Sequence, residues 1–140
     1  MKKSMLLAAA LMAAPLLAQA GETPSPEGAR VYFINLHDGD TIGPKTLIRF
    51  GLSGMGVAPA GVEAPNTGHH HLVINETIEG EELDFGIPAD ENHRHFGAGQ
   101  TEALVELPPG THTLQLVLGD WGHVPHNPPV MSERITVTVE

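Results

Sequence analysis

Histidine is the residue of this sequence best suited to chemistry, with nine copies in 140 residues. His69, His70 and His71 are consecutive, and one residue separates His93 from His95. Side chains two residues apart on a β-strand point to the same face, so each His-x-His pair could hold one ion. Imidazole nitrogen is a good ligand for copper and zinc. This spacing therefore predicts a metal site, with copper as the first choice and zinc as the second.

Other residues of suitable chemistry accompany the two pairs. Met55 and Met131 could add thioether ligands, which favour Cu(I), and Asp120 could accept a hydrogen bond from a ligand imidazole. His70 alternates with Leu72 and Ile74, so we expect it to point inward as a support. The expected ligands are His69, His71, His93, His95, His123 and His126, and the further candidates are His70, Met55, Met131 and Asp120.

Short β-forming segments between turns rich in Gly and Pro must position these side chains, and no segment has helical periodicity. Together they predict an all-β fold, a single antiparallel β-sandwich of immunoglobulin-like type with about seven strands. The expected strands are 30–36, 45–52, 69–76, an edge strand near 83–87, 101–107, 111–119 and 133–139.

Sandwich topology brings distant histidines to one end of the molecule. The third strand runs antiparallel to the sixth, so the histidine triplet should lie beside the loop that follows residue 119. That loop carries His123 and His126, and the connection with His93 and His95 opens toward the same end. Seven of the nine histidines should therefore meet at one rim, and His37 and His112 should lie at the opposite end.

Residues 1–20 have two lysines, an apolar run too short to cross a bilayer and the ending Ala-Gln-Ala, a pattern typical of a cleaved secretory signal peptide. The Pro-rich segment 21–29 is expected to be a flexible leader, and 30–140 to be one domain. We expect an exported protein without a membrane span. A bacterial periplasm is the first choice of compartment, and composition leaves full secretion open.

Charge and cysteine content exclude several functions. The net charge of −10 becomes −12 without Lys2 and Lys3, and such a field repels nucleic acid and attracts cations. There is no cysteine, which excludes thiolate nucleophiles, Cys-ligated zinc and blue-copper centres.

Three stretches resemble a family of small exported bacterial domains of unknown function. They are GMGVAPAGVEAPNTGHHHLVI, HRHFGAGQTE and LPPGTHTLQLVLGDWGHVPHNPPVMSERITVTV, and the similarity extends over roughly 31–139. The resemblance implies that all seven rim histidines, with Gly119 and Asp120, occupy positions of the family's motifs. It implies no activity.

Three functions remain open at this point. The first is a periplasmic metal-binding protein for sequestration, delivery or resistance, with a periplasmic protein as a further candidate partner. The second is a copper or zinc metalloenzyme, although no catalytic acid–base set can be recognised, so we favour a protein that is not an enzyme. The third is an envelope module that binds a protein or glycan through its histidine-rich rim and responds to pH.

Overall fold

The computed structural model describes residues 21–140, and the predicted signal peptide lies outside them. The described residues form nine strands and one short 3-10 helix, which confirms the all-β prediction. The elements are β1 (Arg30–Phe33), β2 (Thr41–Ile42), β3 (Lys45–Ser53), β4 (Gly56–Val57), β5 (Thr67–Ile74), η1 (Gly80–Asp84), β6 (His93–His95), β7 (Glu102–Glu106), β8 (Gly110–Gly119) and β9 (Ile135–Val139).

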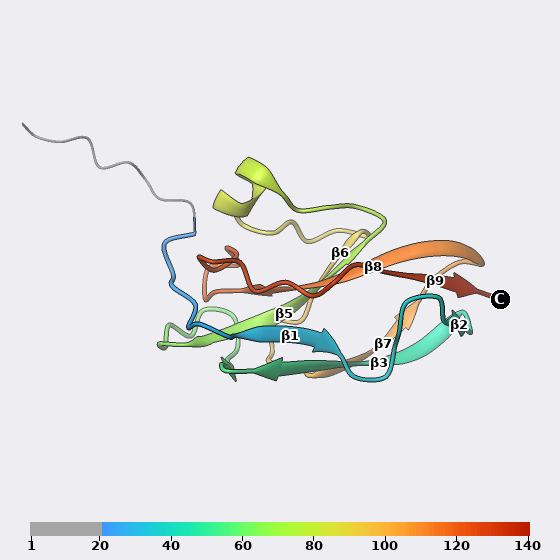
Figure 1. Ribbon diagram of the computed structural model, residues 1–140, viewed down its shortest axis with the longest axis horizontal. Coiled ribbons are helices and arrows are strands. Elements are labelled where there is room, and N and C mark those ends of the chain that lie inside the picture. The colour runs from blue at the N-terminus through green and yellow to red at the C-terminus, as the bar shows by residue number, and fades with distance from the viewer. Residues whose placement is uncertain (1–20) are drawn as a thin grey trace, which may run out of the picture.

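The strands form two sheets that pack as a sandwich (Figure 1). The smaller sheet has the order β1-β3-β7, and the larger has the order β2-β9-β8-β5-β4 with β6 paired to β5. Most pairs are antiparallel, and β2–β9 and β4–β5 are parallel. The described residues contain nine strands rather than about seven because β2, β4 and β6 have two or three residues each, too few to show an alternating pattern.

Alternating residues of the two sheets form the main core. Ile48 and Phe50 of β3 face Leu72 and Ile74 of β5, and Leu116 of β8 belongs to the same buried cluster. Each such side chain contributes about 1.5–3 kcal/mol when it is fully buried. The pattern fixes the register of β5, because a shift by one residue would exchange its two faces.

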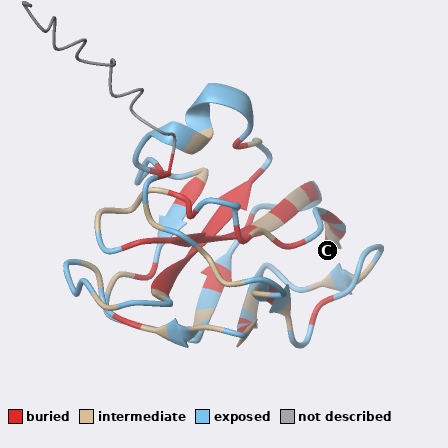
Figure 2. Cartoon of the chain, turned by 60° about the vertical axis from the view of Figure 1, so that its left-hand side comes forward, coloured by how far each residue is buried: buried red, intermediate tan, exposed pale blue. Residues whose placement is uncertain are grey.

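The larger sheet is covered on its outer face as well. Val73 of β5 and Val117 of β8 pack there against Ile78 and Ile87 from the β5–β6 connection. In Figure 1 this connection, with its coiled turn, lies over the sheet on the side away from β1 and β3. Figure 2 shows buried residues concentrated in the central strands and exposed ones around the periphery. Because β5 is covered on both sides, both faces of its histidine triplet are buried.

The edge strand that we predicted near 83–87 is wrong. This part of the chain holds η1, whose first turn closes through hydrogen bonds from Glu82 N to Glu79 O (3.2 Å) and from Glu79 N to Glu82 Oε2 (3.1 Å). Acidic side chains at the start of a helical turn favour that turn. Leu83 packs against the outer-face cluster, so a helical turn rather than an edge strand positions this side chain.

Residues 21–29, expected to be a flexible leader, run beside the loop after β8. Pro24 forms a bridge with Asn127, and Thr23 Oγ1 donates a hydrogen bond to Asp120 Oδ2 (2.7 Å). Ser25 also donates, from its amide to Asn127 O at 3.1 Å. Within 21–140, no helix is long and apolar enough to cross a membrane.

Candidate metal centre

Two adjacent strands, β5 and β6, place histidines on the outer face of the larger sheet. On β5, His69 and His71 share this face because they alternate with the inward residue His70. His71 lies opposite His95 of β6 on one side, and β8 runs antiparallel to β5 on the other side, with His69 opposite Gly119. The predicted pairing of the third and sixth strands is thus confirmed, and β6 brings a third histidine to the first two.

The loop after β8 supplies the fourth histidine. The Asp120 carboxylate accepts hydrogen bonds from Gly122 N and Val124 N through Oδ1, both at 2.9 Å, and closes a tight turn. His123 lies in this turn with φ of 69°, a left-handed conformation that is uncommon for a residue with a side chain. Its carbonyl accepts a hydrogen bond from Ile87 N at 2.8 Å, so the β5–β6 connection holds the turn from the other side.

The four imidazoles form one compact cluster. Their ring centroids lie between 4.7 and 6.0 Å apart. One ligand nitrogen from each ring can be chosen so that all four nitrogens lie within 4.8 Å of one another. His69 Nε2 and His123 Nδ1 are 3.1 Å apart and share a hydrogen bond. The members of this tetrad are His69, His71, His95 and His123.

The four histidines of the tetrad are buried to different extents. His69 and His71 are buried, His123 is half-buried and His95 is exposed. Neither nitrogen of His71 has a hydrogen-bond partner among the described residues, and the same is true of His69 Nδ1. A buried polar atom without a partner costs about 1–3 kcal/mol. His70 also lacks partners among the described residues, but His69 and His71 differ from it because they belong to a cluster that could hold an ion, which would satisfy these atoms.

Two glycines make room for the rings. A Cβ at Gly119 would lie 2.6 Å from His71 Cε1 and 3.0 Å from its Nδ1. A Cβ at Gly97 would overlap the ring of His95. Neither glycine has a positive φ, so space rather than backbone freedom requires the missing side chain. In the sequence, Gly119 stands out only as a motif position, and the one signal for Gly97 is its place two residues after His95, where strand alternation predicts the same face.

Burial also keeps the inner rings free of protons. Desolvation, and next the neighbouring His123 and His95, lower the pKa of His69 to about 4, and Asp120 opposes this shift. Desolvation and the other three members of the tetrad lower the pKa of His71 to about 3. The pKa of His95 is lowered in the same direction, by desolvation and by His123. Neutral imidazole is the form that binds metals, so His69 and His71 are ready to do so at neutral pH.

The tetrad could hold a metal ion. Zinc binds histidine nitrogen at about 2.0–2.1 Å, which places tetrahedral ligands about 3.3 Å apart. The tetrad nitrogens are within 4.8 Å of one another, so small rotations of the rings would bring them to this spacing. Four nitrogen ligands without a thiolate also suit Cu(II).

The structure does not bring His93 and His126 into the tetrad. His93 lies two residues before His95 on β6, opposite Val73, with its Nδ1 2.8 Å from Asp90 Oδ1 and its Nε2 3.5 Å from Glu76 Oε2. The hydrogen bond between His93 and Asp90 holds the pKa of that carboxyl below its usual range. His126 is buried beneath the loop, and its Nε2 lies 3.1 Å from Thr67 O.

The four further candidates lie around the tetrad. His70 points inward, 5.2 Å from the Phe50 ring, and neither of its nitrogens has a partner in the described part of the chain. Met55 packs at the edge of the main core, and Met131 packs against the outer-face cluster beside Val117. The Asp120 carboxylate bonds to the loop backbone and to Thr23, and its charge acts on His69 through space.

Comparison with known proteins places the chain in a family. No curated protein matches the sequence significantly. Among solved structures, the endo-β-1,4-mannanase from Thermotoga petrophila shares 16% identity and a TM-score of 0.45 over 80% of this chain, which spans only 20% of the mannanase chain. Residues 48–140 match the family described as Domain of unknown function (DUF4399), so the expected membership of a family of unknown function is confirmed and the chain belongs to this family.

Proposed function

We propose that this protein binds one copper or zinc ion through His69, His71, His95 and His123 in the bacterial periplasm, and that it sequesters or delivers that metal. The observation that carries the proposal is the geometry of the tetrad. Four imidazoles from three separate segments converge within 4.8 Å, and two of them are buried without enough hydrogen-bond partners.

Copper is the preferred metal. Cu(II) has the highest affinity for nitrogen ligands among the divalent first-row ions, and zinc follows it as an ion that accepts four imidazoles. The chain carries a net charge of −10, which raises the local concentration of cations. The signal-like segment 1–20 supports export to a compartment where such metals arrive from outside the cell.

A binding role is favoured over catalysis. All four ligands of the tetrad come from the protein, as in closed structural sites, whereas catalytic zinc sites keep one position for water or substrate. Asp120, the carboxylate whose charge acts on His69, is engaged by two amides and the Thr23 hydroxyl, so it is not free to serve as a general base.

Isothermal titration of protein purified without a tag and stripped with a chelator tests the proposal. We expect one Cu(II) or Zn(II) per chain with a Kd below about 1 μM, which corresponds to about −8 kcal/mol. His71→Ala should weaken binding at least about 100-fold, because it removes a buried ligand. The matched control is His37→Ala, since the His37 side chain is 79% exposed and distant from the tetrad.

Two results would contradict the proposal. One is the absence of binding tighter than about micromolar for both ions. The other is an equal loss of affinity in His71→Ala and His37→Ala, which would mean that surface histidines bind the metal without a built site.

A further inference from the structure

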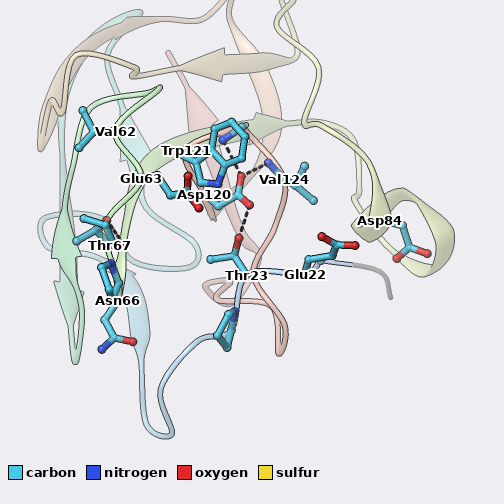
Figure 3. Close-up of a pocket in the computed structure, with 15 residues that line it drawn as sticks. Glu22, Thr23, Val62, Glu63, Asn66, Thr67, Asp84, Asp120, Trp121 and Val124 are labelled. Carbon is cyan, nitrogen blue, oxygen red and sulfur yellow. Dashed lines mark hydrogen bonds between the residues drawn. The ribbon is translucent and has the colours of Figure 1, made fainter. Parts of the chain in front are cut away.

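A large open pocket is lined by the Asp120 turn together with residues 21–24 and 62–67 (Figure 3). Its volume is about 1110 Å³. Small-molecule sites usually measure about 300–1,000 Å³, so this pocket has room for several residues of an extended chain. We name it the Trp121 pocket, and its most informative lining residues are Glu22, Val62, Glu63, Asp84, Asp120 and Trp121.

The lining of the Trp121 pocket combines apolar surface with negative charge. Trp121 and Val62 are each 47% exposed, which is high for large apolar side chains. In the view of Figure 3, Glu22 and Asp84 lie on one side of the pocket and Glu63 lies on the other, with Trp121 between them. None of the described residues that line the pocket is Lys, Arg or His. A ligand that complements this lining carries positive charge on long apolar stems.

We propose that the Trp121 pocket docks an extended segment of a partner protein that is rich in arginine or lysine. The aliphatic stems of such residues would cover Val62 and the neighbouring prolines, and their charged heads would reach the carboxylates of Glu22, Glu63 and Asp84. The indole of Trp121 would accept a guanidinium on its face, which contributes most when both groups are partly desolvated. Exposed Trp is also the residue type that most often dominates binding at protein interfaces.

The pocket shares the Asp120 turn with the tetrad, so docking there would bring a partner close to the metal site, and this role rests on the proposed function. Trp121 and Gly122 connect Asp120, which closes the turn, to the tetrad member His123. Trp121 O also accepts a hydrogen bond from Gly61 N at 2.9 Å, which joins the turn to the segment that carries Val62 and Glu63. A segment bound here would place its parent protein next to the metal centre, where a partner that exchanges the metal must lie.

Trp121 is the only tryptophan of the chain, so its fluorescence reports directly on the pocket. The experiment titrates metal-free protein with a synthetic ten-residue peptide of alternating arginine and alanine, at about 20 mM and about 200 mM salt. The variant is Glu63→Gln with Asp84→Asn. Its matched control is Glu133→Gln with Glu140→Gln, which removes the same charge at exposed positions that do not line the pocket.

We expect the arginine peptide to shift the Trp121 emission, with an affinity that falls at high salt. The pocket variant should weaken binding at least about tenfold, and the control variant should stay within about twofold of the parent protein. The proposal would be overturned by no change in emission, by equal weakening in the two variants, or by equal binding of a peptide with glutamate in place of arginine. Tighter binding of spermine than of the peptide would also overturn it, because the ligand would then be a small polyamine. Metal-free protein is used, so these results stand whether or not the tetrad binds metal.

Discussion

Burial keeps protons away from the two inner histidines of the tetrad, and this predicts how metal affinity depends on pH. Log Kd falls as the pH rises, and each ligand that must lose a proton on binding makes this decrease steeper by one unit per pH unit. The pKa values of about 4 for His69 and about 3 for His71 mean that both rings are already neutral at pH 5. Between about pH 5 and 6 the slope should therefore be at most two. Titrations with zinc at several pH values would measure it, and a slope near four would show that all four rings are protonated in the free protein.

Gly119 leaves room for the His71 ring, and a substitution can test whether metal binding needs that room. The Cβ of Gly119→Ala would lie 2.6 Å from His71 Cε1, so the ring must rotate away from the other three. We expect metal affinity to fall at least about tenfold, which corresponds to about 1.4 kcal/mol. Gly122→Ala is the control, because the nearest atom to its Cβ would be Asp120 Oδ1 at 3.5 Å, an ordinary contact. Isothermal titration of both variants with zinc decides the matter, and equal affinities would mean that the His71 ring adapts without cost.

The Asp120 carboxylate holds the turn after β8 through hydrogen bonds, and its negative charge acts on His69. Two substitutions of Asp120 separate these two effects. Asp120→Asn keeps one side-chain oxygen for Gly122 N and Val124 N but removes the negative charge that acts on His69. We expect metal affinity to fall a few-fold, with little change in stability. Asp120→Ala also leaves the two amides without their acceptor, which should lower the free energy of unfolding by about 1–3 kcal/mol. Urea denaturation and zinc titration of both variants would test this, and equal stability of the two would contradict it.

The longer elements could be predicted from sequence, because alternation and turn residues specify them. The expected strands 45–52, 69–76, 111–119 and 133–139 correspond to β3, β5, β8 and β9, and the antiparallel pairing of β5 with β8 follows from sandwich topology. Alternation on β5 also separated His70 from its two neighbours. Alternation and topology together predict that His69 and His71 share one face and lie beside the loop that follows residue 119.

The remaining features depend on contacts that leave no local pattern. β6 is three residues long, and only its register against β5 shows that His95 lies opposite His71 while His93 lies opposite Val73. The same H-x-H spacing therefore gives one residue in the tetrad and one beside carboxylates. His126 occupies space that Gly68 leaves open, since a Cβ at Gly68 would lie 2.9 Å from its Cε1. Whether each histidine lies in the tetrad depends on contacts between segments that are distant in the sequence, and the spacing of the histidines does not reveal these contacts.

The larger sheet separates the main core from the tetrad, and the histidine triplet contributes side chains to both. Its inner face packs on the main core, and its outer face carries the tetrad beneath the β5–β6 connection. The triplet therefore contributes to both sides: His69 and His71 to the centre, and His70 to the core. Only the first two can act on a metal, so loss of His70 should affect the fold and leave metal affinity nearly unchanged.

The buried position of His70 makes the stability of the metal-free protein depend on acidity. Desolvation lowers its pKa to about 4 in the folded state, whereas the unfolded chain takes up a proton near 6.5. The unfolded state thus binds more protons between these values, and stability falls as the pH falls from 6.5 to 4. His70 alone should account for about 3 kcal/mol of that loss, and His69 and His71 act in the same direction. In the variant His70→Leu, the difference in unfolding free energy between pH 7 and pH 4 should be smaller by about this amount. Urea denaturation at the two pH values would measure it. The zinc affinity of the variant at pH 7 should stay within about twofold of that of the parent protein. An unchanged pH dependence in this variant would show that His70 is protonated, and paired, inside the folded core.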